Sequence, residues 1–378
     1  MINVPMVDLA GQYQKIKAEV DAAFQEILTS TAFINGPAVK KFQANLEQYL
    51  GVKHVIPCAN GTDALQVAMM ALDLQPGDEV ITTTFTFIAT AEVIALLRLT
   101  PVLVDVDPET FNIDPEAIER AITPKTKAIV PVHLFGQCAD MDRIMDIANR
   151  HGLFVIEDNA QAIGADYRHA DGRVSKAGTI GHIGCTSFFP SKNLGCYGDG
   201  GAIFTHDDTL ADKLRVVVNH GMKVRYYHDL VGVNSRLDSL QAAVLDIKLK
   251  HLDEYAKARQ YAASYYNNAF AGNDKLKTPV TAPFTTHVFH QYTLVTHCVN
   301  REKLMEHLAA KGIASAIYYP VPLHMQKAYT DPRYKSGDFP VAEHLSKTVF
   351  SLPIHTEFDD NTLQYVCDAV LEFVNNIR

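Results

Sequence analysis

Short apolar runs alternate with amphipathic segments along residues 54–158, and this alternation constrains the fold more than any other feature of the sequence. The apolar runs are HVIPCA, DEVITTTFTF, PVLVDVD, KAIVPVHLFG and GLFVIEDNA. Strands that alternate with short helices predict βαβ units and a mostly parallel sheet. The runs are apolar nearly throughout, as strands covered on both faces are. We therefore predict an α/β fold whose ligands bind just beyond the carboxyl ends of the strands.

Helical periodicity separates these runs and continues on either side of them. It predicts a long helix from Arg236 to about Phe270, and Gly, Asn and Pro gather soon after it at 272–283. We therefore predict a large α/β domain at 1–255 and a smaller α+β domain at 256–378. The other predicted helices lie at 62–72, 88–98, 115–121, 141–151 and 302–311, and apolar helical stripes precede them at 16–28 and 39–49.

Composition excludes several classes of protein. The chain of 378 residues has 34 basic and 43 acidic side chains, a net charge of −9 and no basic block, which argues against nucleic acid as a partner. No apolar run reaches the length of a membrane span. Six scattered cysteines without a CxxC pair favour free thiols over a disulfide framework or a metal site. The N-terminal residues show no signal-peptide pattern, so we expect a cytoplasmic protein.

Residues that could contact a ligand follow the first two predicted strands. The segment Asn60–Asp63 lies between a strand and a helix, where backbone N–H groups favour an anion such as phosphate. Alternatively, Thr62 simply caps the helix. Phe87 follows the next strand, where its ring either stacks on a flat ligand or belongs to the core.

Two carboxylates, Glu157 and Asp158, end a third strand, and Gln161 follows them. Carboxylates at the end of a buried strand are costly unless they are paired. A metal ion or a cationic ring nitrogen would each explain one of them. No His or Asp companion stands at ligand spacing, so we favour the ring nitrogen.

Lys192 lies in the apolar, Gly- and Pro-bounded segment SFFPSKNLG. Burial lowers the pKa of a lysine and leaves a neutral, nucleophilic amine, which Schiff-base chemistry needs. Taken alone, such a lysine is more often structural than catalytic. Pyridoxal 5'-phosphate (PLP) requires four groups that are all present among these candidates. They are an anion-binding turn, an aromatic ring that stacks on the cofactor, a carboxylate for the ring nitrogen and a nucleophilic lysine.

The chain resembles the DegT/StrS family of sugar-nucleotide aminotransferases over nearly its whole length. This resemblance implies the fold type I, aspartate aminotransferase-like architecture. It also favours transamination, because the relatives that dehydrate instead carry His where this chain has Lys192. The motifs that carry the resemblance are GPAVKKF, NGTDAL, TFTFIAT, VHLFGQ, EDNAQA, SFFPSKNLGCYGDGGA and GVNSRLDSLQAA.

The resemblance implies a role for each candidate residue. Lys192 would hold PLP covalently, Asp158 would bind the pyridine nitrogen, Gln161 would lie against the ring hydroxyl, and Phe87 against the ring face. Asn234 would reach the phosphate from a second subunit, which implies a homodimer with shared active sites. The other implied phosphate ligands are Gly61, Thr62, Asp63 through its backbone, and Ser187.

The stretch KVRYYHDLVGVNSRLD, with Ser191 before the lysine, is similar to enzymes that aminate C3 of a UDP-2-acetamido-3-oxo-glucuronate for surface polysaccharides, with glutamate as donor. Arg236 would then bind the sugar carboxylate, or else pair with Asp238 or with an acid of the second subunit. Further candidate substrate residues are Arg225, His228 and His324, although a loop histidine such as His324 is as readily structural.

Two alternatives stay open within the family: amination of a dTDP-3-keto-6-deoxyhexose, whose enzymes share NSRLD, and a PLP-binding regulator without turnover. A nicotinamide-dependent dehydrogenase would also suit an α/β sheet. That reading is disfavoured, since no GxGxxG follows the first predicted strand.

Overall fold

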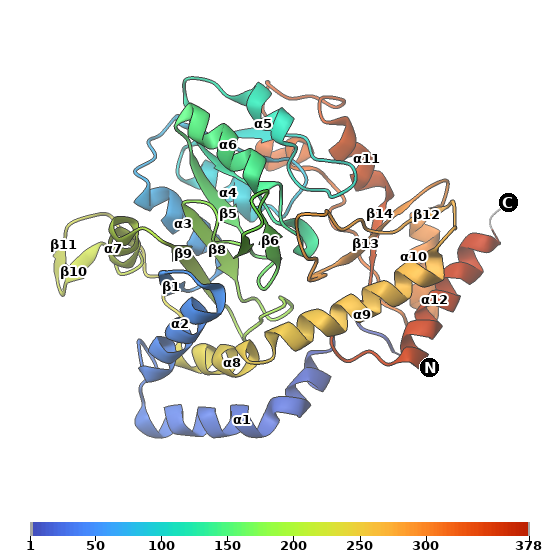
Figure 1. Cartoon of the computed structure of the whole chain (residues 1–378), viewed down its shortest axis with the longest axis horizontal. Coiled ribbons are helices and arrows are strands. Elements are labelled where there is room, and N and C mark those ends of the chain that lie inside the picture. Colours follow the sequence, from blue (N-terminus) through green and yellow to red (C-terminus); the bar gives the residue numbers. More distant parts are fainter. Residues whose placement is uncertain (1–2, 377–378) are drawn as a thin grey trace.

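A seven-stranded sheet with strand order β1-β9-β8-β5-β4-β2-β3 forms the centre of the computed structural model, which describes residues 3–376 (Figure 1). Only β9 runs antiparallel to its neighbours, as predicted for a mostly parallel α/β sheet. The strands are β1 (His54–Cys58), β2 (Glu79–Thr83), β3 (Thr100–Val104), β4 (Thr126–Val130), β5 (Phe154–Asp158), β8 (Ile183–Ser187) and β9 (Gly201–Thr205).

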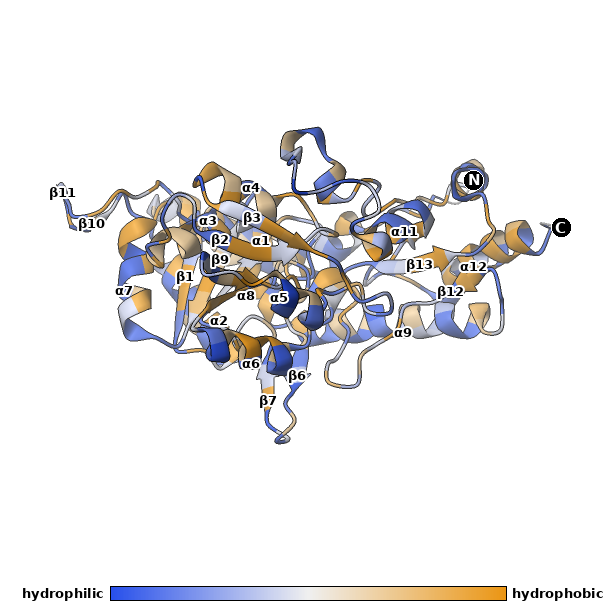
Figure 2. Ribbon diagram, turned by 90° about the horizontal axis from the view of Figure 1, so that it is seen from above, coloured by the Kyte–Doolittle hydropathy of each residue, from blue (hydrophilic) through white to orange (hydrophobic). Residues whose placement is uncertain are grey.

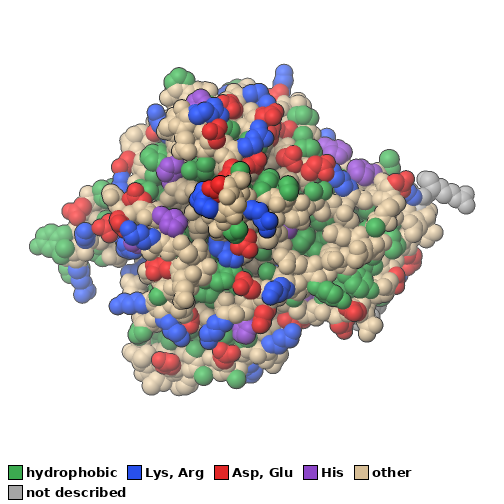
Figure 3. Space-filling model, in the orientation of Figure 1, with side chains coloured by type: hydrophobic (Ala, Val, Ile, Leu, Met, Phe, Trp, Pro, Cys, Tyr) green, Lys and Arg blue, Asp and Glu red, His purple; other side chains and the backbone are tan. Residues whose placement is uncertain are grey.

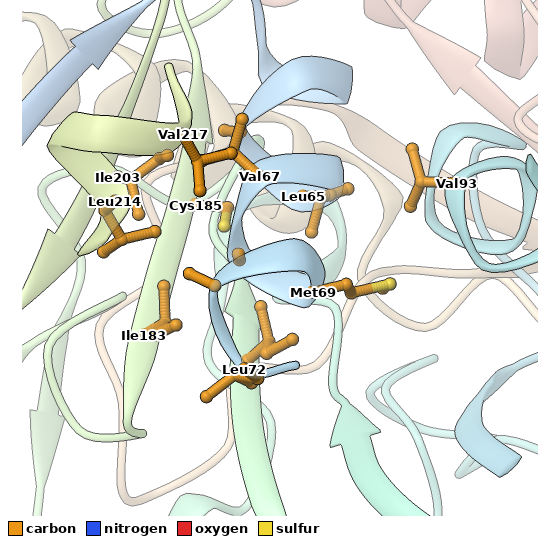
Figure 4. Packing of buried hydrophobic residues seen from close by; sticks show 14 of the residues in the cluster. Leu65, Val67, Met69, Leu72, Val93, Ile183, Cys185, Ile203, Leu214 and Val217 are labelled. Carbon is orange, nitrogen blue, oxygen red and sulfur yellow. The ribbon is translucent and has the colours of Figure 1, made fainter. Parts of the chain in front are cut away.

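Helices cover both faces of this sheet because successive strand residues point to opposite sides. Ala128 and Val130 of β4 pack in one apolar cluster, whereas Ile129 packs in another. Figure 4 shows the first cluster, in which α3 lies across the strands. The first face is covered by α3 (Gly61–Ala71), α4 (Ala89–Leu96) and α7 (Asp208–Val217), and the second by α2 (Pro37–Leu50), α5 (Pro115–Ala121), α6 (Met141–His151) and α8 (Ser239–Leu249).

The predicted helix from Arg236 to Phe270 is two helices, α8 and α9 (Leu252–Phe270). The chain leaves helical geometry at His251, whose φ of −103° and ψ of 0° separate them. The two helices serve different cores, because α8 packs against α2 and the preceding α1 (Leu9–Ser30), whereas Tyr266 of α9 packs in the C-terminal core. Leu28, part of the predicted stripe of α1, is 54% exposed.

A three-stranded antiparallel sheet organises the C-terminal part of the chain. Its core also takes in Val4, whose backbone N–H donates to the Gly312 carbonyl at 2.8 Å. The predicted boundary at residue 255 therefore falls inside α9, and the first residues pack with the last ones. The elements here are β12 (Leu276–Lys277), β13 (Tyr292–Thr296), β14 (Val349–Leu352), α10 (Arg301–Ala310), α11 (Pro340–Thr348), α12 (Asp360–Asn375) and the 3-10 turns η2 (Leu323–Met325) and η3 (Lys327–Tyr329).

Two hairpins extend from the body of the molecule. One consists of β6 (Asp166–Arg168) and β7 (Val174–Lys176) beside α6, and the other of β10 (Met222–Val224) and β11 (Tyr227–His228) beyond α7 (Figure 2). The second hairpin forms the apolar knob at the left of Figure 3. Its exposed apolar side chains are Val224, Tyr226, Tyr227, Leu230 and Val231.

Two compositional predictions can be compared with residues 3–376. All six cysteines are free thiols, as predicted, and only Cys298 is exposed. No helix in this range is long and apolar enough to cross a bilayer.

Candidate active site

The ends of β1 and β8 meet at one edge of the sheet and form a cradle for an anion. A Cβ atom on Gly61 would lie 2.6 Å from the Cβ of Ser187, so only glycine allows this contact. Gly61 and Thr62 are the first residues of α3, and their N–H groups have no acceptor within residues 3–376. Free N–H groups at a helix N-terminus favour a phosphate.

Asn60 takes the capping role that the sequence left open for Thr62. Its side-chain oxygen accepts a hydrogen bond from the Asp63 N–H at 2.8 Å. That N–H is therefore engaged, and the backbone contact implied for Asp63 is not available in this structure. Ser187 and the first two residues of α3 supply the cradle instead.

The adjacent carboxylates of β5 point to opposite faces and have different surroundings. Glu157 is fully buried and accepts hydrogen bonds from His133 Nε2 at 2.7 Å and from three backbone N–H groups at 2.5–2.8 Å. Within residues 3–376 the Asp158 carboxylate accepts only from Thr90 Oγ1 at 2.7 Å and the Ala160 N–H at 3.1 Å. Asp158 is thus the carboxylate that is free to meet a cationic ring nitrogen.

Lys192 lies in the loop after β8, near Asp158. Burial lowers the pKa of its amine to about 8, against the opposing effect of the Asp158 carboxylate. A neutral amine is therefore accessible close to physiological pH.

Lys248 on α8 is a second buried lysine, and burial also lowers its pKa to about 8. Its ammonium donates to the Gly195 carbonyl at 2.8 Å and lies over the Tyr197 ring. These contacts engage the amine of Lys248, so Lys192 stays the candidate nucleophile that the sequence predicts.

Aromatic side chains lie beside Gln161 and Phe87. Phe87 is 56% exposed, so it is not the core residue that the sequence also allowed, and its ring lies 6.5 Å from that of Tyr319. Gln161 accepts from the Phe135 N–H at 2.8 Å and donates to Tyr319 Oη at 3.0 Å. Sequence reasoning did not single out Tyr319 or Thr90, although Thr90 ends the quoted run TFTFIAT.

Asn234 and Arg236 flank Ser235, whose hydroxyl accepts from the Ala59 N–H at 3.0 Å, two residues before the cradle. Neither flanking side chain has a partner within residues 3–376, so the pairing of Arg236 with Asp238 is absent. Arg236 precedes α8 rather than starting a helix.

The remaining predicted substrate residues lie elsewhere in the chain. Arg225 stacks on the neighbouring Tyr226 ring, and His228 contacts the His220 carbonyl, both on the β10–β11 hairpin at the edge of the molecule. The sequence predicted that His324 could line the sugar site, and the structure shows a buried ring with both nitrogens in contact with other side chains. Its buried ring nitrogens are engaged by Thr84 at 2.8 Å and Glu343 at 3.2 Å, because it links the end of β2 to α11.

A family model for DegT/DnrJ/EryC1/StrS aminotransferases matches residues 14–371. The chain belongs to this family. A pleiotropic regulatory protein of Geobacillus stearothermophilus is 48% identical over 98% of this chain and 99% of its own length. A UDP-2-acetamido-2-deoxy-3-oxo-D-glucuronate aminotransferase of Pseudomonas aeruginosa is 46% identical, over 97% and 99% respectively.

Two further similarities come from Streptomyces venezuelae. A dTDP-3-amino-3,4,6-trideoxy-alpha-D-glucose transaminase is 42% identical, over 99% of this chain and 97% of its own length. The crystal structure of DesV in complex with a ketimine intermediate has a TM-score of 0.95 at 41% identity and covers both chains fully. This aminotransferase therefore has fold type I architecture, as predicted.

The chain is a PLP-dependent sugar aminotransferase. Its residues fit the cofactor: the free N–H groups of Gly61 and Thr62 suit a phosphate, Asp158 suits a protonated ring nitrogen, and Lys192 has an amine of lowered pKa. Within residues 3–376 no group of three or more His, Cys, Asp or Glu side chains could hold a metal ion.

We predict that borohydride reduction of the cofactor-loaded protein attaches the cofactor to Lys192, as read by peptide mapping. A lysine of pKa about 8 is about 9% neutral at pH 7 and about 91% neutral at pH 9. The rate at which the stripped protein captures the cofactor should therefore rise about tenfold between these pH values. Lys248→Met should keep the label on Lys192, and a label on Lys248 would contradict the assignment.

We predict that Asp158→Asn lowers turnover by about 10²–10⁴ in a folded protein, because a neutral amide cannot hold the ring nitrogen protonated. Glu157→Gln is the matched comparison. It should cost about 3–5 kcal/mol in the free energy of unfolding, measured in urea, because the buried network loses its charge and one of its two acceptor oxygens. Normal turnover of folded Asp158→Asn would leave the ring nitrogen without its assigned partner.

Proposed function

We propose that this aminotransferase moves the amino group of glutamate to the C3 keto group of a UDP-2-acetamido-2-deoxy-3-oxo-hexuronic acid, for the synthesis of surface polysaccharide sugars. The observation that carries the proposal is the guanidinium of Arg236, which has no partner within residues 3–376 and follows Ser235, whose hydroxyl accepts from the Ala59 N–H just before the cradle. The similarity to the Pseudomonas aeruginosa enzyme supports the same substrate class.

Arg236 suits a uronic acid because a guanidinium offers two parallel N–H donors to one carboxylate. Ser235 ties the chain beside Arg236 to Ala59, at the end of β1, and thus to the cradle. A neutral 6-deoxy sugar would leave this charge without a partner in a partly dry site, which is unfavourable.

The residues of the chain divide the work of the reaction. Bound PLP supplies the electron sink for charge that develops at the reacting carbon. The Lys192 amine would accept a proton from that carbon and deliver it to a second carbon, so that the amino group changes carrier. Asp158 keeps the ring nitrogen protonated, and the orientation of Gln161 is set by the Phe135 N–H and Tyr319.

A homodimer with shared active sites is part of this proposal. Asn234 is exposed and without a partner in residues 3–376, and the β10–β11 hairpin carries exposed apolar side chains together with Arg225 and His228. A second subunit would cover these side chains and could receive Asn234 at its own phosphate site.

Two other functions have a specific observation in their favour. The Streptomyces venezuelae transaminase supports a dTDP-linked deoxy sugar as substrate. The Geobacillus stearothermophilus relative is named a pleiotropic regulatory protein, which supports a regulatory role beside amino transfer. A glutamate half-reaction tests amino transfer in either case.

We predict that Arg236→Ala lowers kcat/KM for the 3-oxo-uronate by roughly 30- to 4,000-fold, the equivalent of about 2–5 kcal/mol for breaking one side of a charged pair. Arg236→Lys keeps the positive charge but lacks the two parallel N–H donors of a guanidinium. Its kcat/KM should lie between those of wild type and Arg236→Ala. A neutral 6-deoxy analogue, assayed in parallel, should react equally with wild type and Arg236→Ala. Equal losses on both substrates would make Arg236 structural and favour the deoxy sugar.

We predict that mixing inactive Lys192→Ala with an Asn234→Phe variant restores about a quarter of wild-type turnover after subunit exchange. Half of the dimers would be mixed, and each would hold one intact site. Lys192→Ala mixed with Asp158→Asn is the control that should restore nothing. One chain contributes both residues to a given site, so every site of the mixed dimer lacks one of them. No recovery in the Asn234 mixture, with exchange verified, would place each site within one chain.

A further inference from the structure

A second array of reactive side chains joins the β6–β7 hairpin to α6. Ser175 Oγ lies 3.0 Å from His169 Nε2, and His169 Nδ1 lies 2.6 Å from the Asp142 carboxylate. The two ring nitrogens thus contact the hydroxyl and the carboxylate in the order that a Ser-His-Asp catalytic triad requires.

Further contacts hold this array in position. The second carboxylate oxygen of Asp142 accepts from the Ala170 N–H at 2.8 Å, and the Asp142 N–H donates to Tyr167 Oη at 2.9 Å. The His169 ring also packs edge-on against the Tyr167 ring at 5.0 Å between centroids. When His169 Nδ1–H donates to the Asp142 carboxylate, Nε2 is left to accept a hydrogen bond from the Ser175 hydroxyl.

All three residues line an open groove of about 680 Å³ beside the hairpin. Thr179 and Ile180 on its wall precede β8, whereas Ser187 of the PLP site ends β8. The groove therefore lies toward the opposite edge of the sheet from the PLP site. Figure 2 shows the β6–β7 hairpin extending from the body next to α6.

A similar array elsewhere in the chain shows why the groove matters. Thr84, His324 and Glu343 also combine a hydroxyl, an imidazole and a carboxylate, but Thr84 is fully buried and no substrate can reach it. Ser175 is half-buried at the groove wall. Access to a ligand separates the two arrays.

We propose that Asp142, His169 and Ser175 form a second catalytic site that hydrolyses neutral short-chain acyl esters. Ser175 Oγ bonds to the ester carbonyl carbon, its proton passes to His169 Nε2, and His169 then protonates the departing alcohol. Water cleaves the acyl-serine to release the carboxylic acid, with His169 as base. The net reaction consumes one ester and one water and involves no oxidation or reduction.

The groove wall favours a neutral substrate. Asp142 and Asp146 line the groove together with Arg173, whose guanidinium is already paired with Asp171 at 2.7 Å, so the wall offers an anionic ester no unpaired arginine. Met145 and Ile180 provide apolar contact for a short acyl group. The Asn149 side-chain amide lines the same groove and has no hydrogen-bond partner within residues 3–376, so it is a free neutral donor there.

The test treats the PLP-loaded protein with a fluorophosphonate probe and maps the adduct by mass spectrometry. We expect one adduct per chain, on Ser175, because an unactivated serine does not react with such a probe, and none on Thr84. Hydrolysis of p-nitrophenyl acetate should disappear in Ser175→Ala. Amino transfer and the melting temperature of that variant should match wild type and show that it is folded.

His169→Gln provides the second variant. It retains Ser175 but removes the base, so labelling should slow by roughly 10²-fold or more. Failure of the probe to modify Ser175 in the wild-type protein would overturn the proposal even if every variant misfolds, and the array would then only clamp the hairpin to α6. Equal ester hydrolysis by wild type and Ser175→Ala would also overturn it.

Discussion

The buried carboxylate of Glu157 holds together the part of the sheet on which the active site depends. It binds His133 after β4 and the backbone N–H groups of Gly178, Ile180 and Gly181 before β8, while it belongs to β5 itself. Three neighbouring strands are therefore joined at one side chain, where four donors replace the water that the charge has lost. Because Glu157 points to one face of the sheet, the next residue of the strand, Asp158, points to the opposite face.

The active site combines opposing electrostatic effects on one lysine. Burial disfavours the charged form of Lys192, whereas the neighbouring Asp158 favours it, and the resulting pKa of about 8 keeps both forms accessible near neutral pH. A proton carrier in amino transfer needs both forms. Lys248 has a similar pKa but cannot serve as a proton carrier in the same way, because its amine donates a hydrogen bond to the Gly195 carbonyl.

Location in the fold gives similar side chains different roles. His324 and His169 each lie between a hydroxyl and a carboxylate, but His324 ties the end of β2 to α11 in the interior, whereas His169 lies at the wall of a groove. The same holds for Phe85 and Phe87, since one is fully buried and the other more than half exposed.

The sequence by itself determined the α/β class, the mostly parallel sheet, the PLP chemistry and the candidate roles of Lys192 and Asp158, because these follow from local patterns: apolar strand runs, the residues after them and continuous motifs. Only the tertiary structure decided which groups are free to act. The Asn60 side chain accepts a hydrogen bond from the Asp63 N–H. Thr84 and Glu343 contact the two ring nitrogens of His324. The Arg236 side chain has no partner within residues 3–376. It also divided the expected helix after Arg236 at His251, where α8 and α9 enter different cores. Such outcomes depend on contacts between residues far apart in the chain, and a local pattern carries no record of which donors and acceptors those contacts satisfy.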